Sequence, residues 1–167
     1  MDWTSWIKQF GRYIVVMLLQ VFLFDQLQFF GLCHPYIYVL CLLMMPITLR
    51  PSADLFIGAF AGLMMDLFSN SMGVHMAACV LIMFLRRYLL ELLVNEHDRL
   101  NEQISLRAIG MVAWIEYVVI LVLLHHGLVF FLSAWSWHYI GVVIGETLIS
   151  GLFTISVIVG YNALRYR

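Results

Sequence analysis

Long apolar runs, separated by short polar breaks, constrain this sequence more than any other feature. Of its 167 residues, 63% are hydrophobic and only 11% are charged. Soluble domains are about half apolar and about a quarter charged, whereas a membrane-spanning helix needs about 20 consecutive apolar residues. The sequence therefore predicts an all-α integral membrane protein that forms a single transmembrane domain over residues 1–167.

Six apolar runs are predicted to pack as a compact bundle of transmembrane helices. Their approximate limits are 10–29, 35–49, 52–69, 74–93, 108–125 and 139–163. The second and third runs are short for a bilayer, which makes their limits less exact. The predicted number of crossings remains even. The only markedly polar stretch, residues 95–107, is expected to be a solvated connector. An amphipathic helix or a docking site for a cytoplasmic protein is the alternative for it.

The basic residues predict the orientation of these six spans. If the N-terminus is cytoplasmic, every lysine and arginine falls in a cytoplasmic part or at a helix end beside one, as the positive-inside rule requires. A five-span arrangement would place the C-terminal arginines outside. The net charge of −1 gives no basic footprint for nucleic acid. The residues concerned are Lys8, Arg12, Arg50, Arg86, Arg87, Arg99, Arg107, Arg165 and Arg167.

The most specific local pattern lies in residues 58–75, GAFAGLMMDLFSNSMGVH. Gly58, Gly62 and Asp66 are spaced four apart, so they share one face of a helix. The two glycines allow a second helix to approach closely. The chain is expected to turn at the SNS tripeptide and to begin a new apolar helix after Gly73. Because a buried acid beside a glycine seam needs a partner, this hairpin is predicted to lie at the centre of the bundle.

Three carboxylates, Asp66, Glu116 and Glu146, fall within predicted spans. Ionisable residues in a membrane usually face the bundle interior, a cavity or a partner. No lysine or arginine is predicted at the same depth, so we expect these groups to be protonated, hydrogen-bonded or paired with another protein. For Asp66 a functional role and a structural hydrogen bond are equally balanced, and for Glu116 and Glu146 the structural role is favoured.

The sixth predicted span carries a second pair of small residues four apart, Gly141 and Gly145, directly before Glu146. Such spacing is typical of close helix packing in membranes. The wall of a cavity is the alternative.

Five histidines are predicted at the external side, where an amphipathic imidazole suits the membrane interface. A metal-binding or pH-sensing cluster is the alternative, although no spacing matches a known metal motif. No phosphate-binding loop, nucleophile elbow or dinucleotide-binding turn occurs either. We therefore predict no enzymatic activity, no metal and no cofactor. The histidines are His34, His75, His125, His126 and His138.

The segment GLMMDLFSNSMGVH, residues 62–75, resembles the signature of the bacterial rod-shape-determining MreD family. The glycine, the aspartate four residues later, the Ser-x-Ser turn and the next glycine all match, and the resemblance is specific over about residues 56–78. It implies a non-enzymatic scaffold of the elongation machinery, which supports cell shape and lateral peptidoglycan synthesis. It also implies the bacterial cytoplasmic (inner) membrane, with both termini cytoplasmic.

The partners that this resemblance implies are an MreC-like bitopic membrane protein, an MreB-like actin, a RodA-like glycosyltransferase and a class B penicillin-binding protein. The family is also similar in fold to the substrate-binding S-components of energy-coupling-factor transporters. The alternative function is therefore the substrate-binding membrane component of a vitamin or metal transporter. Structural or partner-contact roles are predicted for Gly58, Gly62, Asp66, Gly73, Glu116, Gly141, Gly145 and Glu146.

Overall fold

The computed structural model describes residues 3–25, 33–45, 50–93 and 110–165, and these ranges contain helices but no β-strand. The predicted all-α class is confirmed. The polar connector at residues 95–107 lies outside the described residues, as do parts of the first, second and fifth predicted spans. The described α-helices are α1 (Trp3–Leu19), α2 (Val39–Leu43), α3 (Pro51–Ser69), α4 (Val74–Leu93), α6 (Met111–Ala134) and α7 (Ile140–Arg165).

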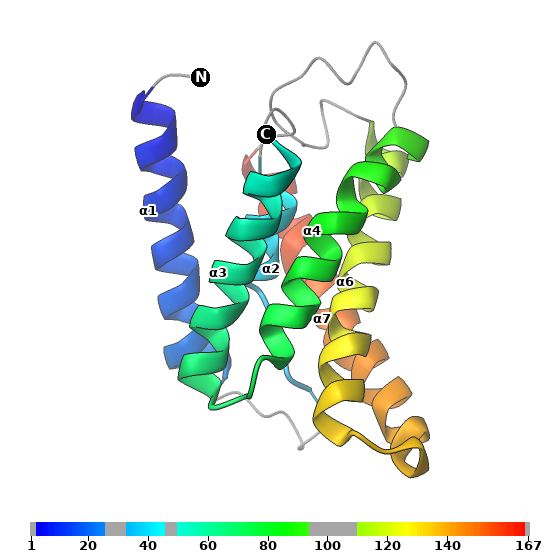
Figure 1. The fold of residues 1–167 in the computed structure, drawn as a ribbon. Coiled ribbons are helices and arrows are strands. Elements are labelled where there is room, and N and C mark those ends of the chain that lie inside the picture. The colour runs from blue at the N-terminus through cyan, green and yellow to red at the C-terminus, as the bar shows by residue number, and fades with distance from the viewer. Residues whose placement is uncertain (1–2, 26–32, 46–49, 94–109, 166–167) are drawn as a thin grey trace.

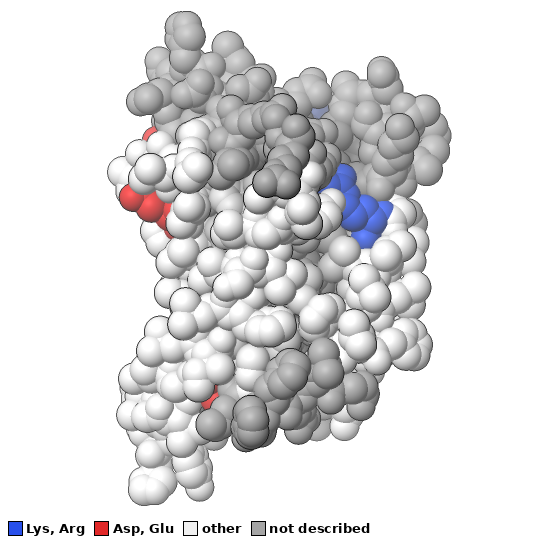
Figure 2. Space-filling model, turned by 180° about the vertical axis from the view of Figure 1, so that it is seen from behind, with Lys and Arg blue, Asp and Glu red and all other residues white. Residues whose placement is uncertain are grey.

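Among the described residues, three helical segments are long and apolar enough to cross a membrane: α3, α6 and the segment Trp137–Leu164, which covers α7 except for Arg165. A shorter apolar helix, Gly11–Phe24, ends in a π-helical turn over Gln20–Phe24. The long helices run side by side, and α1 begins at the same end of the bundle at which α7 ends (Figure 1). Seen from behind, the middle of the bundle is a broad uncharged surface, and most of the visible charge lies towards one end (Figure 2). This distribution suits a lipid environment.

The second predicted span differs most from the sequence-based expectation. A helix was expected over residues 35–49, but the helix observed there is only five residues long, and residues 37–45 are all buried. The segment lies behind α3 and α4 (Figure 1). It is apolar on every side because it is enclosed by protein on every side, and it is therefore a central strut rather than a lipid-facing helix.

Polar side chains of the surrounding helices satisfy the backbone of this strut, residues 33–45. Before α2, the Gln20 side chain donates to the Pro35 carbonyl (2.9 Å) and accepts from the Ile37 amide (2.7 Å). After it, Arg86 of α4 donates to the carbonyls of Leu42 (3.0 Å) and Met45 (2.6 Å). The Tyr117 hydroxyl of α6 donates to the Leu43 carbonyl (3.0 Å), and Ser150 of α7 accepts from the His34 amide (2.9 Å). Irregular backbone is tolerated at membrane depth only when protein satisfies it in this way.

The fifth predicted span was expected to end at residue 125, where two histidines and a glycine follow. Instead α6 continues to Ala134 and ends where Trp135 adopts a left-handed conformation (φ 43°). The helix continues because His125 and His126 are buried and hydrogen-bonded inside the bundle.

One buried carboxylate is paired with an arginine of the same chain, which was not expected. Asp54 of α3 is 1% exposed, and its carboxylate accepts a hydrogen bond from Nε of Arg87 on α4 at 2.9 Å. The pair joins α3 and α4 at the end of the bundle opposite the hairpin turn.

We expect Arg87→Met to destabilise the protein by about 1–3 kcal/mol. Removing one partner leaves a buried charge uncompensated, and the cost is moderated because Arg87 is partly exposed. Unfolding measurements in detergent would show this loss. The double variant Arg87→Met with Asp54→Leu should recover much of it, whereas an additive loss would contradict the pairing.

Candidate functional site

The α3–α4 hairpin is closed by the carboxylate of Asp66. One oxygen accepts hydrogen bonds from the Ser71 hydroxyl (2.6 Å) and from the His75 amide (2.9 Å). The other accepts from the Met76 amide (2.9 Å). Asp66 therefore satisfies amides in the first turn of α4, where no carbonyl of the same helix is available, and places a negative charge at the favourable end of the helix dipole. Two roles were considered for Asp66, a functional one and a structural hydrogen bond. These contacts are hydrogen bonds of the structural kind.

The turn between the helices has the conformation that its small residues allow. Asn70 is left-handed (φ 51°), and its amide donates to the Asp66 carbonyl, which ends α3. Gly73 has φ 84°, a region that residues with a side chain rarely adopt. The Gly73 carbonyl then accepts from the Ala77 amide and starts α4 (3.0 Å).

The two glycines of α3 lie directly against the backbone of α4. A Cβ atom added at Gly62 would come within 2.6 Å of both the His75 carbonyl oxygen and the Met76 amide nitrogen. One added at Gly58 would lie 3.0 Å from the Cys79 carbonyl oxygen. The helices are thus as close as backbone allows, in the manner of small-residue packing in membranes. Gly58, Gly62 and Asp66 form one continuous contact, which we call the hairpin seam.

The other four predicted residues do not join the hairpin seam. Gly141 and Gly145 of α7 have no described neighbour within 4 Å of an added Cβ atom, so neither helix packing nor a cavity wall accounts for them among the described residues. Glu116 is exposed on α6, and Glu146 is only partly buried on α7. Of the three environments considered for it, Glu116 therefore does not face the bundle interior. Among the described residues, nothing packs against the two glycines, which leaves them open to lipid or to another protein.

Three of the histidines expected at the interface lie instead in the core. His125 and His126 are fully buried, and His75 is 3% exposed. The Tyr38 hydroxyl lies 2.7 Å from Nε2 of His125 and 3.2 Å from Nδ1 of His75. A phenol has one proton, so Tyr38 can donate to only one of its neighbours, which also include the Cys79 thiol at 3.4 Å. The three side chains form a buried chain of hydrogen bonds from the hairpin to the centre of α6, which we call the histidine relay.

His126 is fixed separately. Its Nδ1 lies 2.9 Å from the Val122 carbonyl, which only accepts, so Nδ1 carries the proton. In the neutral ring Nε2 must then accept from the Thr154 hydroxyl of α7, 3.1 Å away. This contact ties α6 to α7 through a polar pair that the surrounding apolar packing shields from water.

Sequence reasoning missed Gln20, Tyr38 and Arg86 as organising residues. Each is fully buried. The available signal was the shortness of the second apolar run, because a segment too short to cross a bilayer as a helix needs polar partners from its neighbours. The sequence alone does not show which neighbours supply them.

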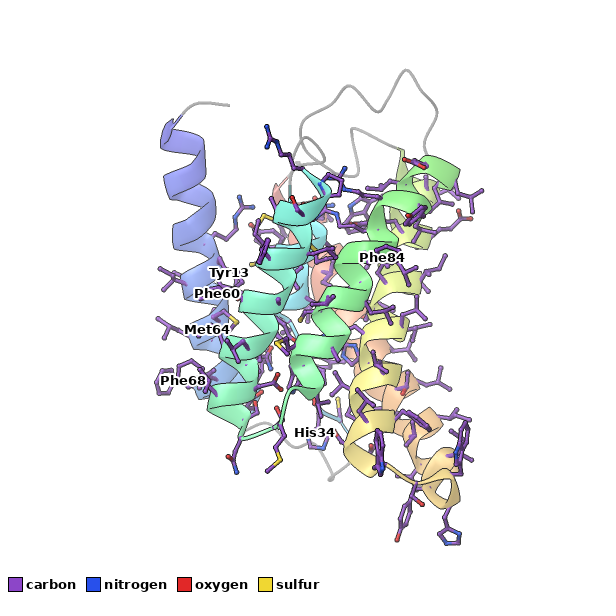
Figure 3. The ribbon with its side chains drawn as sticks, in the orientation of Figure 1. Tyr13, His34, Phe60, Met64, Phe68 and Phe84 are labelled. Carbon is purple, nitrogen blue, oxygen red and sulfur yellow. The ribbon has the colours of Figure 1, made fainter. Side chains whose placement is uncertain are left out.

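Two cavities lie beside the C-terminal part of α1 and the π-helical turn that follows it. One is an apolar groove of about 370 Å³ between α1 and α3, lined without any polar surface. Phe60, Met64 and Phe68 lie along its α3 side, with Tyr13 across from them on α1 (Figure 3). A groove of this kind has room for hydrocarbon, whether a lipid chain or side chains of another helix.

The second cavity, of about 320 Å³, is mostly polar and opens at the hairpin end of the bundle. Asp25, His34, Tyr36, Ser69 and His75 contribute to its wall, and His34 lies at this end (Figure 3). We call it the hairpin-end pocket. Among the residues that the structure describes, no group of three histidine, cysteine, aspartate or glutamate side chains is arranged to hold a metal ion.

Comparison of the chain with protein-family models, with curated proteins and with solved structures finds no match.

Proposed function

We propose that this protein is a non-enzymatic membrane scaffold of the bacterial elongation machinery. The observation that carries the proposal is the hairpin seam, because the residues that resemble the MreD signature are those that hold α3 against α4. Gly62 sets the distance between the helices, Asp66 supplies the cap of α4, and Gly73 supplies the turn. A signature composed of packing and capping residues suits a scaffold better than an enzyme.

In this proposal the chain crosses the inner membrane six times, as a bundle resembling the energy-coupling-factor S-components. The strut takes the place of the second spanning helix. Both termini are cytoplasmic, on the side where the lysines and arginines gather. The bundle holds the transmembrane helix of an MreC-like partner and thereby positions the RodA-like glycosyltransferase, the class B penicillin-binding protein and the MreB-like actin.

The test is affinity purification of the full-length protein from its native membrane in mild detergent, with partners identified by mass spectrometry. Recovery of an MreC-like protein together with wall synthases is the expected result. Recovery of a coupling ATPase pair without wall proteins would overturn the scaffold proposal in favour of transport.

We expect Gly145→Leu to reduce recovery of the MreC-like partner severalfold while the fold is retained. Gly145 has open space around an added Cβ atom, so the larger side chain disturbs only a molecule that packs from outside. Thermal unfolding of the purified variant reports on the fold, and co-purification reports on the partner. Gly11→Leu, at an equally open position on α1, is the matched control. Equal recovery with both variants would remove α7 from the contact.

The second candidate is the substrate-binding component of a transporter, and the hairpin-end pocket is the observation that favours it. A pocket of about 320 Å³ is at the small end of the range for ligand sites. Stabilisation of the purified protein by a vitamin or a metal ion would support this function. An unchanged unfolding temperature across a broad panel of both would count against it.

A further inference from the structure

The hairpin-end pocket is built from three parts of the chain that are distant in sequence. The π-helical turn after α1 contributes Phe24 and, directly after it, Asp25. The start of the strut contributes His34 and Tyr36, and the hairpin contributes Phe68, Ser69 and His75. Among the described residues, its lining contains one carboxylate and neither lysine nor arginine. Since neutral imidazole, phenol and hydroxyl groups add no charge, the pocket is net negative when Asp25 is ionised.

The Asp25 carboxylate is held in place by hydrogen bonds to both of its oxygens. One accepts from Nε2 of Gln20 at 2.8 Å, and the other accepts from the Ser69 hydroxyl at 3.2 Å. Gln20 is itself fixed by the strut, to which it donates and from which it accepts. Each carboxylate oxygen has a second lone pair, so Asp25 retains the capacity to accept from a ligand. Because the Asp25 side chain is already held in place, it loses little conformational freedom when a ligand binds.

Aromatic rings supply the rest of the recognition surface. Phe24, Tyr36 and Phe68 all line the pocket. The Tyr36 ring is packed edge-on against His75, with ring centres 4.9 Å apart, and against His125 at 5.8 Å. Aromatic faces attract cations within about 6 Å. Aromatic rings together with the Asp25 carboxylate therefore suit a ligand that carries a positive charge on an apolar framework.

His75, which lines the pocket, also contacts the hairpin seam. The His75 amide is bonded to Asp66, and its ring is bonded to Tyr38 of the histidine relay. Backbone and side chain of this residue are therefore both fixed before any ligand arrives. Pre-organisation of this kind lowers the entropic cost of binding.

We propose that the hairpin-end pocket binds a small organic cation, with its ammonium group on Asp25 and its apolar body against Phe24, Tyr36 and Phe68. A primary ammonium has three donors, two of which can use the two remaining lone pairs of Asp25. An organic cation fits better than a metal ion, because the described residues offer no group of three ligating side chains. Binding of such a cation is independent of whether the protein also holds a partner helix.

The experiment measures thermal unfolding and Kd for the full-length protein in lipid nanodiscs. The probe is phenethylammonium, and the comparison is 2-phenylethanol, which has the same body without the charge. The principal variant is Asp25→Asn. Glu116→Gln is the matched control, because it makes the same change at an exposed carboxylate outside the pocket. Phe68→Leu, at a side chain that is already 60% exposed, tests the aromatic contribution without threatening the fold.

We expect phenethylammonium, but not 2-phenylethanol, to raise the unfolding temperature of the wild-type protein. Asp25→Asn should weaken binding by about tenfold or more, as expected for loss of a charge-assisted hydrogen bond, while Glu116→Gln leaves Kd unchanged. Phe68→Leu should weaken binding by about two- to fivefold. Equal stabilisation by the alcohol, unchanged affinity in Asp25→Asn, or a response to Zn²⁺ alone would overturn the proposal. If Asp25→Asn does not fold, the wild-type contrast between the amine and the alcohol still decides it.

Discussion

Replacing Asp66 by alanine is expected to lower the free energy of unfolding by about 3–5 kcal/mol. The Asp66 carboxylate is the acceptor for the Ser71 hydroxyl and for two amides at the start of α4. Alanine offers no acceptor, so those amides are left buried without a partner at the site where the helix dipole most favours a negative charge. Unfolding in detergent gives the total loss, and hydrogen exchange at the His75 and Met76 amides locates it.

Asp66→Asn separates hydrogen bonding from charge. Its carbonyl oxygen can still accept from Ser71 and His75, but its NH₂ group then faces the Met76 amide, so we expect a smaller loss of about 1–2 kcal/mol. Glu116→Ala is the control for removal of a carboxylate, and it should change stability by less than about 0.5 kcal/mol because Glu116 is exposed. Asp66→Ala with wild-type stability would contradict the capping role.

Gly62→Leu is expected to prevent the native contact between α3 and α4. Even the first added carbon would come within 2.6 Å of the His75 carbonyl oxygen and the Met76 amide nitrogen. Both atoms are backbone, which cannot rotate away as a side chain does. Overpacking a core usually costs about 1–3 kcal/mol, and a clash with backbone should exceed this range. We expect loss of the folded protein on size-exclusion chromatography, and a measurable loss of stability already in Gly62→Ala.

Gly141→Leu is the matched control for this prediction. Gly141 is also a helical glycine in a small-xxx-small pair, but an added Cβ atom meets nothing within 4 Å. Leucine is also a better helix former than glycine, so the purified variant should be as stable as wild type or slightly more so. If Gly141→Leu and Gly62→Leu reduced stability equally, the effect would come from glycine replacement in general and not from the hairpin seam.

The sequence was most informative where structure depends on local spacing. The interval between Gly58, Gly62 and Asp66 predicted one helix face, and all three residues do lie against α4 or its cap. The same spacing at Gly141 and Gly145 predicted packing that the described residues do not provide. Spacing shows that a close approach is allowed, but not which helix, if any, makes use of it.

The polar core could not be predicted because it depends on contacts between distant residues. Tyr38 and His125 are 87 residues apart in sequence and 2.7 Å apart in the structure. In the sequence, a histidine within an apolar run suggests the end of a buried helix, because its hydrogen-bond partner is not known. For this reason the end of α6 was predicted too early. Arg86 was likewise assigned to a helix end by its charge, although its donors satisfy carbonyls of the strut inside the core.

The strut also determines the order in which this protein can be assembled during synthesis. Residues 37–45 emerge from the ribosome long before α6, yet Tyr117 of α6 supplies a partner for the Leu43 carbonyl. A helix of five residues does not satisfy its own backbone in lipid. The segment must therefore wait in a protected place, beside the translocon or an insertase, until the later helices arrive. Truncation of the nascent chain before α6 should therefore leave residues 37–45 exposed to proteolysis, so changes in the second apolar run should affect biogenesis as well as the finished fold.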